Sequence, residues 1–448
     1  MSSEKKITRR TYLKYAAGAV AVAAVGGGAY YAGLGQAPPT TTPAMTTSAI
    51  TTPITTTIPT NAGLTGKPIV IGGSLPLSGA GAYDGERGLQ GFKIAVQKIN
   101  EDGGVLGRPL KLVMRDDGGS EDRVSSVTET LITQDKADFL TGSYGAGSTY
   151  AALVVAKKYG KLMTGSLVAG RSCFTDFKGN IVSVHASADY ESDWYIPFTD
   201  MMDAFSQWST GGAKPKTIAI IHANIMWNHD VHDHWIPILE DRGYKIVMED
   251  YLDMMTTDFR PALTKAKSLN PDIIVGGTWF FMSVLTMKQM VELGFYPPAI
   301  FLADGSDFSF VDPSAGVGPQ GNGVFFTEPY PGSSIPELRG RDGDYLEEQY
   351  KLAMNRSADY FSGVCFSAVQ VLAQAIEAAG TVDTDAVRQA LFTKEFNTAI
   401  WSRTVFNEFG VQKYFKPLAA QWQDNKKEIV WPSDYATAKP IYPYVPVK

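Results

Sequence analysis

Short apolar runs alternate with amphipathic stretches over the first part of the folded sequence. An apolar run of four to eight residues between turn signals is typical of a buried strand, and apolar residues at every third or fourth position are typical of a helix. This order of elements, with short connections, predicts a parallel sheet covered by helices on both faces. The pattern predicts strands at 68–75, 110–114, 139–140 and 161–164 and helices at 88–100, 122–134 and 149–159.

The same alternation restarts near Gly211 and Gly212, which predicts a second doubly wound unit. Two α/β lobes therefore enclose a crevice, where ligands bind beyond the carboxyl ends of parallel strands. The predicted strands are 217–222, 245–249, 272–276 and 299–302, and the helices are 194–208, 232–242, 259–268 and 283–293. Further helices are predicted at 344–354, 363–379 and 383–391, and closing strands at 404–406 and 419–423.

Composition narrows the class of protein. The 448 residues are 44% hydrophobic and 19% charged, which is an ordinary globular balance. The net charge of −6 argues against a nucleic-acid partner, which would require a basic face. Two cysteines, Cys173 and Cys365, exclude a disulfide scaffold and the cysteine-rich zinc modules. Whether these two pair stays open, because pairing depends on their distance in space.

Residues 1–35 have the pattern of a targeting segment. Arg9 and Arg10, followed by Thr-Tyr-Leu-Lys, resemble a twin-arginine export signal. The apolar stretch 15–34 is just long enough to cross a bilayer, which takes about 20 residues. A cleaved signal and a retained membrane anchor are both open, and the length favours the anchor. Either one predicts export to the periplasm or to the extracellular face of the membrane.

Residues 36–66 read as a Thr/Pro-rich stalk. Between positions 40 and 60, 11 of 21 residues are Thr, and no charged residue occurs between Lys14 and Lys67. Such a composition cannot bury a core and is typical of a glycosylated stalk or a plain linker. We therefore expect a folded body from about Lys67, held off the membrane. Asn355 begins a generic N-glycosylation motif.

A glycine-rich loop at 142–147 lies between a predicted strand and a predicted helix, where backbone N–H groups can face an anion. Its spacing, Gly-x-x-Gly-x-Gly, differs from the dinucleotide fingerprint. A carboxylate or another polar ligand is therefore favoured over a nucleotide.

Four of the five histidines lie close together in the sequence, which raises the question of a metal. His229 and His232 share a helix face, but His234 points elsewhere and no Cys or Glu completes a local set. A polar helix N-terminus is favoured, and no metal or cofactor is predicted. The sequence also lacks a Gly-x-Ser-x-Gly elbow, a His-Glu-x-x-His motif and a Walker loop, so no catalytic residue is predicted.

Residues 72–79 read Gly-Gly-Ser-Leu-Pro-Leu-Ser-Gly, and residues 103–112 read Gly-Gly-Val-Leu-Gly-Arg-Pro-Leu-Lys-Leu, followed by Asp116-Asp117. These segments, with 372–377 and 421–424, resemble the leucine/isoleucine/valine-binding-protein family, the type I periplasmic binding proteins of ABC importers. The resemblance implies two Rossmann-like lobes joined by a three-strand hinge. It places lobe 1 at 67–188 and 328–408, and lobe 2 at 189–327 and 409–448.

The family's ligand contacts can be carried over by position. Gly145 and Val168 stand where the amino-acid binders place hydroxyl residues. Asp304 either pairs with a ligand ammonium group or serves as a turn residue. The aromatic members imply a flat, bulky or apolar ligand. The implied contacts are Ser78, Tyr83, Ser143, Tyr144, Gly145, Gly165, Ser166 and Val168 from lobe 1, and Trp227, Trp279, Phe280 and Asp304 from lobe 2.

The resemblance implies an extracytoplasmic solute-binding protein rather than an enzyme. It would capture a small organic ligand, such as an amino acid or a related carboxylate or aromatic compound, and deliver it to an ABC permease. A monomer is expected, touching the membrane only through its N-terminal segment. Two alternatives remain: a ligand-sensing receptor domain and, less favoured, a nucleotide-dependent enzyme.

Overall fold

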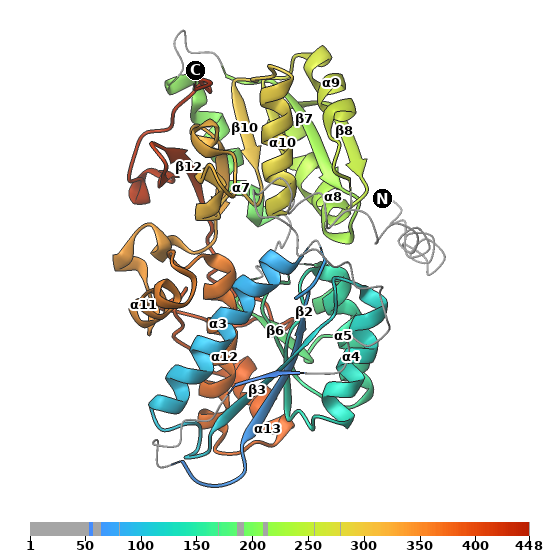
Figure 1. Ribbon diagram of the computed structural model, residues 1–448, viewed down its shortest axis with the longest axis vertical. Coiled ribbons are helices and arrows are strands. Elements are labelled where there is room, and N and C mark those ends of the chain that lie inside the picture. Colours follow the sequence, from blue (N-terminus) through green and yellow to red (C-terminus); the bar gives the residue numbers. More distant parts are fainter. Residues whose placement is uncertain are drawn as a thin grey trace, which may run out of the picture.

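The computed structural model describes residues 53–56, 64–79, 81–168, 170–185, 192–208, 214–254, 256–277 and 279–447. Within these ranges the chain forms two α/β lobes, one above the other in Figure 1. The predicted export signal or anchor at 1–35, and most of the predicted stalk at 36–66, lie outside the described residues.

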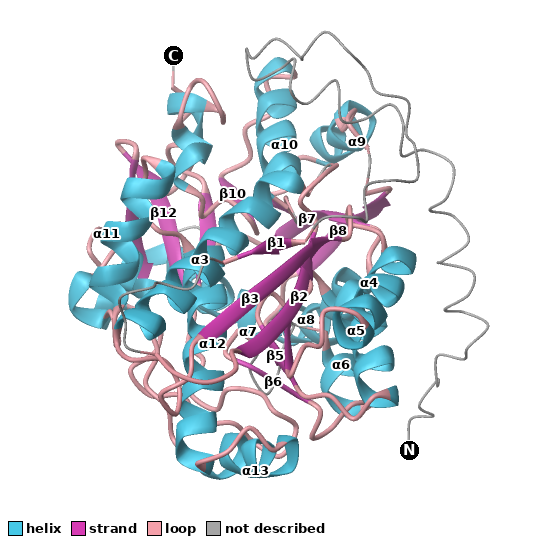
Figure 2. Cartoon of the chain, turned by 60° about the horizontal axis from the view of Figure 1, so that its bottom comes forward, coloured by secondary structure: helices cyan, strands magenta, loops and turns pink. Residues whose placement is uncertain are grey.

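Lobe 1 is built on a sheet whose described strands follow the order β1-β3-β2-β4-β5-β6. Strands β2 to β6 are parallel, and β1 is antiparallel to β3. Figure 2 shows α4 and α5 on one side of β2 and β3 and α3 and α12 on the other. The strands are β1 (Ile54–Thr55), β2 (Ile69–Leu75), β3 (Leu110–Asp116), β4 (Phe139–Gly142), β5 (Met163–Gly165) and β6 (Ile181–Ser183). The helices are α3 (Ala82–Glu101), α4 (Glu121–Thr133), α5 (Ala146–Lys158), α6 (Arg171–Thr175), α11 (Gly343–Met354), α12 (Tyr360–Ala379) and α13 (Thr384–Thr393).

Lobe 2 has a second sheet, with the described strands in the order β13-β12-β11-β10-β9-β7-β8. Strands β7 to β11 are parallel, and β12 and β13 close the sheet in antiparallel fashion. The strands are β7 (Thr217–Ala223), β8 (Lys245–Leu252), β9 (Ile273–Gly276), β10 (Ala299–Leu302), β11 (Phe325–Glu328), β12 (Leu418–Gln423) and β13 (Lys426–Trp431). The helices are α7 (Ser192–Ala204), α8 (Met226–Asp241), α9 (Arg260–Leu269) and α10 (Phe280–Glu292).

The chain passes between the two sheets three times: between β6 and α7, between β11 and α11, and between α13 and β12. This arrangement confirms the predicted pair of Rossmann-like lobes. The predicted lobe boundary at 188/189 lies outside the described residues. The boundary at 408/409 needs a correction, because Phe409 and Val411 pack into the core of lobe 1 and Val411 bridges to Ser183. The third crossing therefore follows Val411.

Most predicted elements are confirmed to within a few residues, and the exceptions have physical causes. The closing strand predicted at 404–406 is wrong, because Thr404 and Phe406 make only single bridges, to Phe396 and Gln412. The pattern also does not predict β6, β11 or β13: β6 and β11 are only 3 and 4 residues long, and β13 follows β12 after a tight turn. A two-residue strand, β1, occurs inside the predicted stalk, where Ile54 and Thr55 pair with β3.

Helix α3 begins at Ala82 rather than at residue 88, because its glycines serve packing and do not interrupt the helix. A Cβ at Gly91 would lie 2.2 Å from the carbonyl oxygen of Ser362 in α12. A Cβ at Gly85 would lie 2.2 Å from the carbonyl oxygen of Pro76. These glycines let α3 approach its neighbours closely, which places its N-terminal turn at the edge of lobe 1 that faces lobe 2.

The variant Gly91→Ala is therefore expected to lower the free energy of unfolding by about 1–3 kcal/mol, the usual cost of overpacking. The added methyl group meets backbone rather than a movable side chain. Chemical denaturation measures the change. Val154→Ala, at an exposed position of α5, is the control and is expected to change stability by less than about 0.5 kcal/mol.

Helix α12 is the one described helix that is long and apolar enough to cross a membrane by length and composition. Its most apolar window is 83% buried inside the protein, as in the core helix of a globular domain. Asp359 and Ser362 form a capping box at its N-terminus, which fixes where the helix begins. Tyr360 and Phe361, the first residues of α12, are thereby held at the lobe interface.

Candidate ligand-binding site between the lobes

Aromatic residues occupy the first turns of helices from both lobes. Tyr83 lies at the start of α3 and Tyr360 at the start of α12, both in lobe 1. In lobe 2, Trp227 lies in the first turn of α8, and Phe280 begins α10. Helices that follow parallel strands start at the carboxyl edge of the sheet, where ligands bind in such folds. The rings of Tyr83 and Phe280 stack at a centroid distance of 4.8 Å, so the two lobes touch here.

A buried ionic cluster joins the lobes beside these rings; we call it the interlobe cluster. At its centre is Arg87 of α3, whose side chain is 0% exposed. Its guanidinium lies 2.6 Å from Asp84, 2.8 Å from Asp307, 3.1 Å from Asp359 and 3.7 Å from Asp304. The members of the interlobe cluster are Asp84, Arg87, Arg356 and Asp359 from lobe 1, and Asp304 and Asp307 from lobe 2.

Arg356 closes the outer rim of the cluster. Its Nη1 donates to the hydroxyl oxygen of Tyr83 and, at 2.8 Å, to that of Ser309 in lobe 2. The Tyr83 hydroxyl in turn donates to Asp307 at 2.9 Å. A cavity of about 350 Å³ lies at this rim. It is lined by Tyr83, Phe308, Ser309, Asp312, Met354, Asn355 and Arg356.

The carboxylates of the cluster differ in their surroundings. Burial raises the pKa of Asp304 well above its usual value, against the opposing pull of Arg87. Burial likewise raises the pKa of Asp84, and Arg87 again opposes it. For Asp307, burial is outweighed by Arg87 and Arg356, and the pKa is lowered. Asp304 is 4% exposed, and neither of its carboxylate oxygens has a hydrogen-bond partner among the described residues.

A belt of aromatic rings runs along the interface from the cluster. The Arg87 guanidinium carbon lies 3.8 Å from the centre of the Phe361 ring. The centre of that ring lies 5.4 Å from the ring centre of Tyr144 and 4.5 Å from that of Tyr360. The belt continues to Trp194, whose ring centre lies 5.6 Å from that of Tyr360. It ends at Trp227, whose ring centre lies 6.2 Å from that of Trp194. Within the described residues, the indole Nε1 atoms of both tryptophans are buried without a hydrogen-bond partner.

The structure brings half of the sequence-predicted site residues to this interface. Tyr83 and Asp304 contact the cluster, Phe280 stacks on Tyr83, and Trp227 ends the aromatic belt. Tyr144 lies 6.0 Å from Trp279 across the interface, and its hydroxyl donates to Asp84 at 3.4 Å. Tyr83 belongs to the first turn of α3 rather than to the turn before it. These residues are Tyr83, Tyr144, Trp227, Trp279, Phe280 and Asp304.

Two of the remaining predicted residues lie in or beside the loop before α5. Ser143 is buried, with its hydroxyl 3.3 Å from that of Ser74. Gly145 is the N-cap of α5, with a φ of 85°, and adds no side-chain cap. A Cβ at Gly147 would lie 1.8 Å from Oε1 of Glu121, so this carboxylate sits against the N-terminal turn of α5.

The other four lie elsewhere in lobe 1. Val168 is fully buried in the core of lobe 1, and Gly165 packs against it. Ser166 is buried and lies beside the Cys365 thiol. Ser78 is exposed, near Gly118.

Sequence reasoning missed the residues that surround Asp304, above all Arg87. The available signal was a lone Arg in a glycine-rich apolar helix, with Asp84 one turn before it. Its other partners lie 220 and 272 residues away along the chain, which no local pattern reveals. The residues missed are Asp84, Arg87, Trp194, Asp307, Arg356, Asp359, Tyr360 and Phe361.

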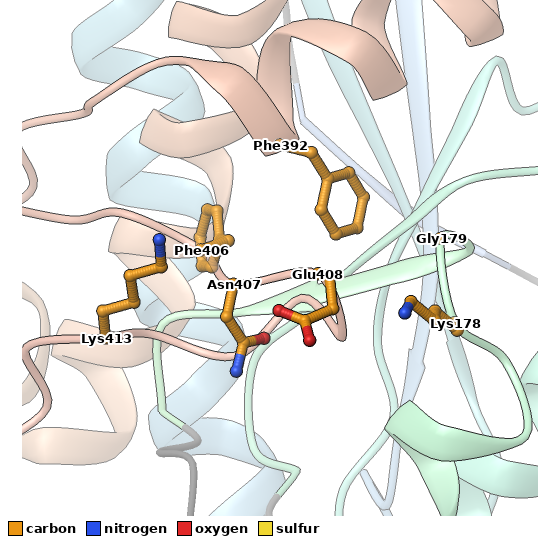
Figure 3. A pocket seen from close by; sticks show the side chains of 7 residues that line it. All are labelled: Lys178, Gly179, Phe392, Phe406, Asn407, Glu408 and Lys413. Carbon is orange, nitrogen blue, oxygen red and sulfur yellow. The ribbon is translucent and has the colours of Figure 1, made fainter.

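A separate cavity of about 400 Å³ lies on lobe 1 (Figure 3). It is lined by Lys178, Gly179, Phe392, Phe406, Asn407, Glu408 and Lys413. Lys413 donates its backbone N–H to the Val405 carbonyl, and the other residues precede Val411, so a molecule bound there would contact lobe 1 and would not bring the lobes together. We therefore place the candidate site at the interlobe cluster.

The histidines and cysteines have local roles. His232 Nδ1 lies 2.7 Å from Glu249, and His229 Nε2 lies 2.8 Å from the side-chain oxygen of Asn224. No group of three His, Cys, Asp or Glu side chains in the described part of the chain is arranged to hold a metal ion. Cys173 and Cys365 are both buried free thiols, which answers the question of their pairing.

Comparison with known proteins identifies a family and relatives that span most of the chain. The periplasmic binding protein family matches residues 68–414. The Leu/Ile/Val-binding protein homolog 7 of Brucella abortus (strain 2308) is 25% identical over 380 residues, covering 83% of this chain and 93% of its own length. The leucine-, isoleucine-, valine-, threonine-, and alanine-binding protein of Pseudomonas aeruginosa is 24% identical over 351 residues, covering 78% of this chain and 88% of its own length.

Solved structures share the fold. The branched-chain amino acid transporter substrate binding protein LivJ from Streptococcus pneumoniae, in complex with isoleucine, superposes with a TM-score of 0.67 at 21% identity, covering 84% of this chain and 100% of its own. A solute binding protein of an ABC transporter from R. palustris, in complex with benzoate, superposes with a TM-score of 0.69 at 17% identity. The match covers 81% of this chain and 96% of the R. palustris chain. With the family match spanning most of its folded body, the chain belongs to the periplasmic binding protein family.

Proposed function

We propose that this protein is an extracytoplasmic solute-binding protein that closes its two lobes on a small organic molecule and presents it to an ABC permease. The observation that carries the proposal is the Asp304 carboxylate. It is buried at the lobe interface, and neither oxygen has a hydrogen-bond partner within the described residues. A buried polar group without a partner costs about 1–3 kcal/mol, and a ligand N–H group would remove that cost.

The chemistry of the interface suits a ligand that combines an N–H or cationic group with an apolar body. Asp304 accepts, and the indole N–H groups of Trp194 and Trp227 donate. The rings of Tyr144 and Tyr360 offer flat surface for stacking. Amino acids and related carboxylates or aromatic compounds are the ligand classes to test first, because named relatives bind amino acids and a structural neighbour holds benzoate.

The proposal extends to the export signal, the stalk and the oligomeric state of the protein. Residues 1–35 would direct export through the twin-arginine route and remain as a membrane anchor, which the basic flank and apolar stretch support. Residues 36–66 would form a stalk, with the two-residue strand β1 docked on lobe 1. The body would act as a monomer. A ligand-sensing receptor with the same fold is the alternative, and permease and ATPase genes beside the coding sequence would argue against it.

Lobe closure is tested by small-angle scattering. We expect the radius of gyration to fall when ligand is added, because the ligand bridges Asp304 of lobe 2 and the lobe 1 rings. Ligand at 100 times its dissociation constant should also stabilise the folded protein by about 2.7 kcal/mol. Native mass spectrometry of the purified protein identifies any co-purified ligand for this measurement. A proven ligand that leaves the radius of gyration unchanged would contradict closure.

The variant Trp227→Ala is expected to weaken ligand binding more than about tenfold while changing the apo melting temperature little. Trp227 is only partly buried and lies at the end of the aromatic belt, where Tyr195 stacks against it and Trp194 meets it edge-on. The matched control is Trp235→Ala in the same helix. Trp235 is fully buried and donates to Thr199 at 2.8 Å, so its loss should cost about 3–5 kcal/mol of stability. Equal ligand affinity in Trp227→Ala and the parent would remove Trp227 from the site.

A further inference from the structure

The interlobe cluster holds more negative than positive charge. Its four carboxylates, Asp84, Asp304, Asp307 and Asp359, face two guanidinium groups. Asp307 contacts both arginines, and Asp84 and Asp359 each lie within 3.1 Å of Arg87. Asp304 has only the longer 3.7 Å contact to Arg87. Two carboxylates therefore have no matching positive charge, and Asp304 is the member of the cluster whose oxygens have no hydrogen-bond partner in the described chain.

The lobe 1 loops nearby offer little to a ligand carboxylate. The hydroxyl of Ser143 lies 3.3 Å from that of Ser74, and the Val168 side chain is in the core. The N-terminal turn of α5, next to Tyr144, already faces the Glu121 carboxylate at Gly147. A helix N-terminus that faces one carboxylate attracts a second one less, because like charges repel.

Uncharged hydrogen-bond donors and aromatic rings at the same interface suit the uncharged part of a ligand. Trp194 and Trp227 bring buried indole N–H groups without partners in the described residues, and these donate to a hydroxyl or carbonyl oxygen. Burial raises the pKa of the Tyr144 and Tyr360 hydroxyls, and the charge of the neighbouring Asp304 raises both further. A cation beside Asp304 therefore meets aromatic rings, which attract positive charge through their faces.

We propose that the ligand is an organic amine, bound as a cation with its ammonium group at Asp304 and carrying no carboxylate. This inference rests on the proposed solute-binding function and narrows its substrate class. A hydroxyl or carbonyl group and a flat apolar body complete the ligand. The charge excess of the interlobe cluster selects the cation, and Glu121 disfavours the α-carboxylate that an amino acid would add.

Three matched series of compounds test the proposal on the purified protein by calorimetric titration at pH 7. Each carbon skeleton, aromatic, branched or linear, is offered as a primary amine, an α-amino acid and a carboxylic acid; 2-phenylethylamine, phenylalanine and 3-phenylpropionate form the aromatic set. The amine of the best-bound skeleton is expected to bind at least tenfold more tightly than its amino acid. Tighter binding of an amino acid or of an acid overturns the amine assignment and leaves the solute-binding function standing. Binding of no member of any series contradicts both.

The variant Glu121→Gln gives an independent readout. Removing this carboxylate from the N-terminal turn of α5 should raise the affinity for the α-amino acid of the best-bound skeleton at least threefold and leave the amine affinity within twofold. Asp122→Asn, the next residue of the same helix, is the control and is expected to change neither affinity. An unchanged ratio of amine to amino-acid affinity in Glu121→Gln would overturn the role of Glu121 in selection.

Discussion

The variant Arg87→Met is expected to lower the free energy of unfolding by about 3–5 kcal/mol at pH 7, which is the usual cost of removing one partner from a buried ion pair. Arg87 is fully buried and lies within 3.1 Å of three carboxylates from both lobes. Without its charge, these carboxylates repel one another inside the protein. Chemical denaturation gives the change in stability, and small-angle scattering should show more open lobes.

The loss should depend on pH, and its direction follows from the pKa shifts. The pKa of Asp307 is lowered in the folded protein. Its stabilising contribution is therefore present above the unfolded pKa and is lost as the pH falls through the folded pKa. Arg87→Met removes that contribution at neutral pH, whereas acid protonates the crowded carboxylates and relieves their repulsion. The stability gap between parent and variant is therefore expected to stay wide down to about pH 4, the ordinary pKa of Asp, and to narrow as the pH falls further.

Arg403→Met is the matched control for this substitution. Arg403 pairs with Glu395 at 2.9 Å, but both side chains are more than half exposed. Exposed ion pairs are worth about 0–1 kcal/mol because water screens them. A stability loss of similar size in Arg87→Met and Arg403→Met would contradict the central role of Arg87. A loss in Arg87→Met that does not vary with pH would contradict its electrostatic origin.

The order of strands and helices could be predicted from the sequence because each element carries its own periodic pattern. The strand at Ala299–Leu302 is an unbroken apolar run, and the pattern predicts its bounds without error. The start of α3 was predicted six residues too late, since Gly85 suggests a turn and in fact allows the helix to pack closely against Pro76. The strand predicted at 404–406 failed because a few apolar residues do not supply a neighbouring strand with which to pair.

The candidate site was only partly predictable, for a different reason. Position in the family pattern places a residue on a loop but does not say where its side chain points. Asp304 and Tyr144 face the interface, whereas Val168 packs into the core and the hydroxyl of Ser143 lies beside that of Ser74. The burial of Arg87 in the site could not be predicted from the sequence, because a charged residue in an amphipathic helix normally faces solvent. Its burial depends on acids 220 and 272 residues further along the chain.

The variant Asp304→Asn is expected to reduce ligand affinity about a hundredfold, which corresponds to about 3 kcal/mol. Charge-assisted hydrogen bonds contribute about 1.5–3 kcal/mol each, and Asp304 has two oxygens to offer. Calorimetric titration with the ligand identified by mass spectrometry measures the change. Asp312→Asn, at an exposed position of the rim cavity, is the control and should leave the affinity within a factor of two.

The same variant should not lower the melting temperature of the apo protein, and this separates a binding residue from a structural one. Burial raises the folded pKa of Asp304, so its contribution to stability is full below the unfolded pKa and is lost as the pH rises through the folded pKa. The Asn side chain does not ionise, so above neutral pH the variant should melt at or above the temperature of the parent. A clear fall in melting temperature would instead make Asp304 part of the structural ion network around Arg87. Reduced affinity together with undiminished apo stability is the result that a ligand-binding carboxylate requires.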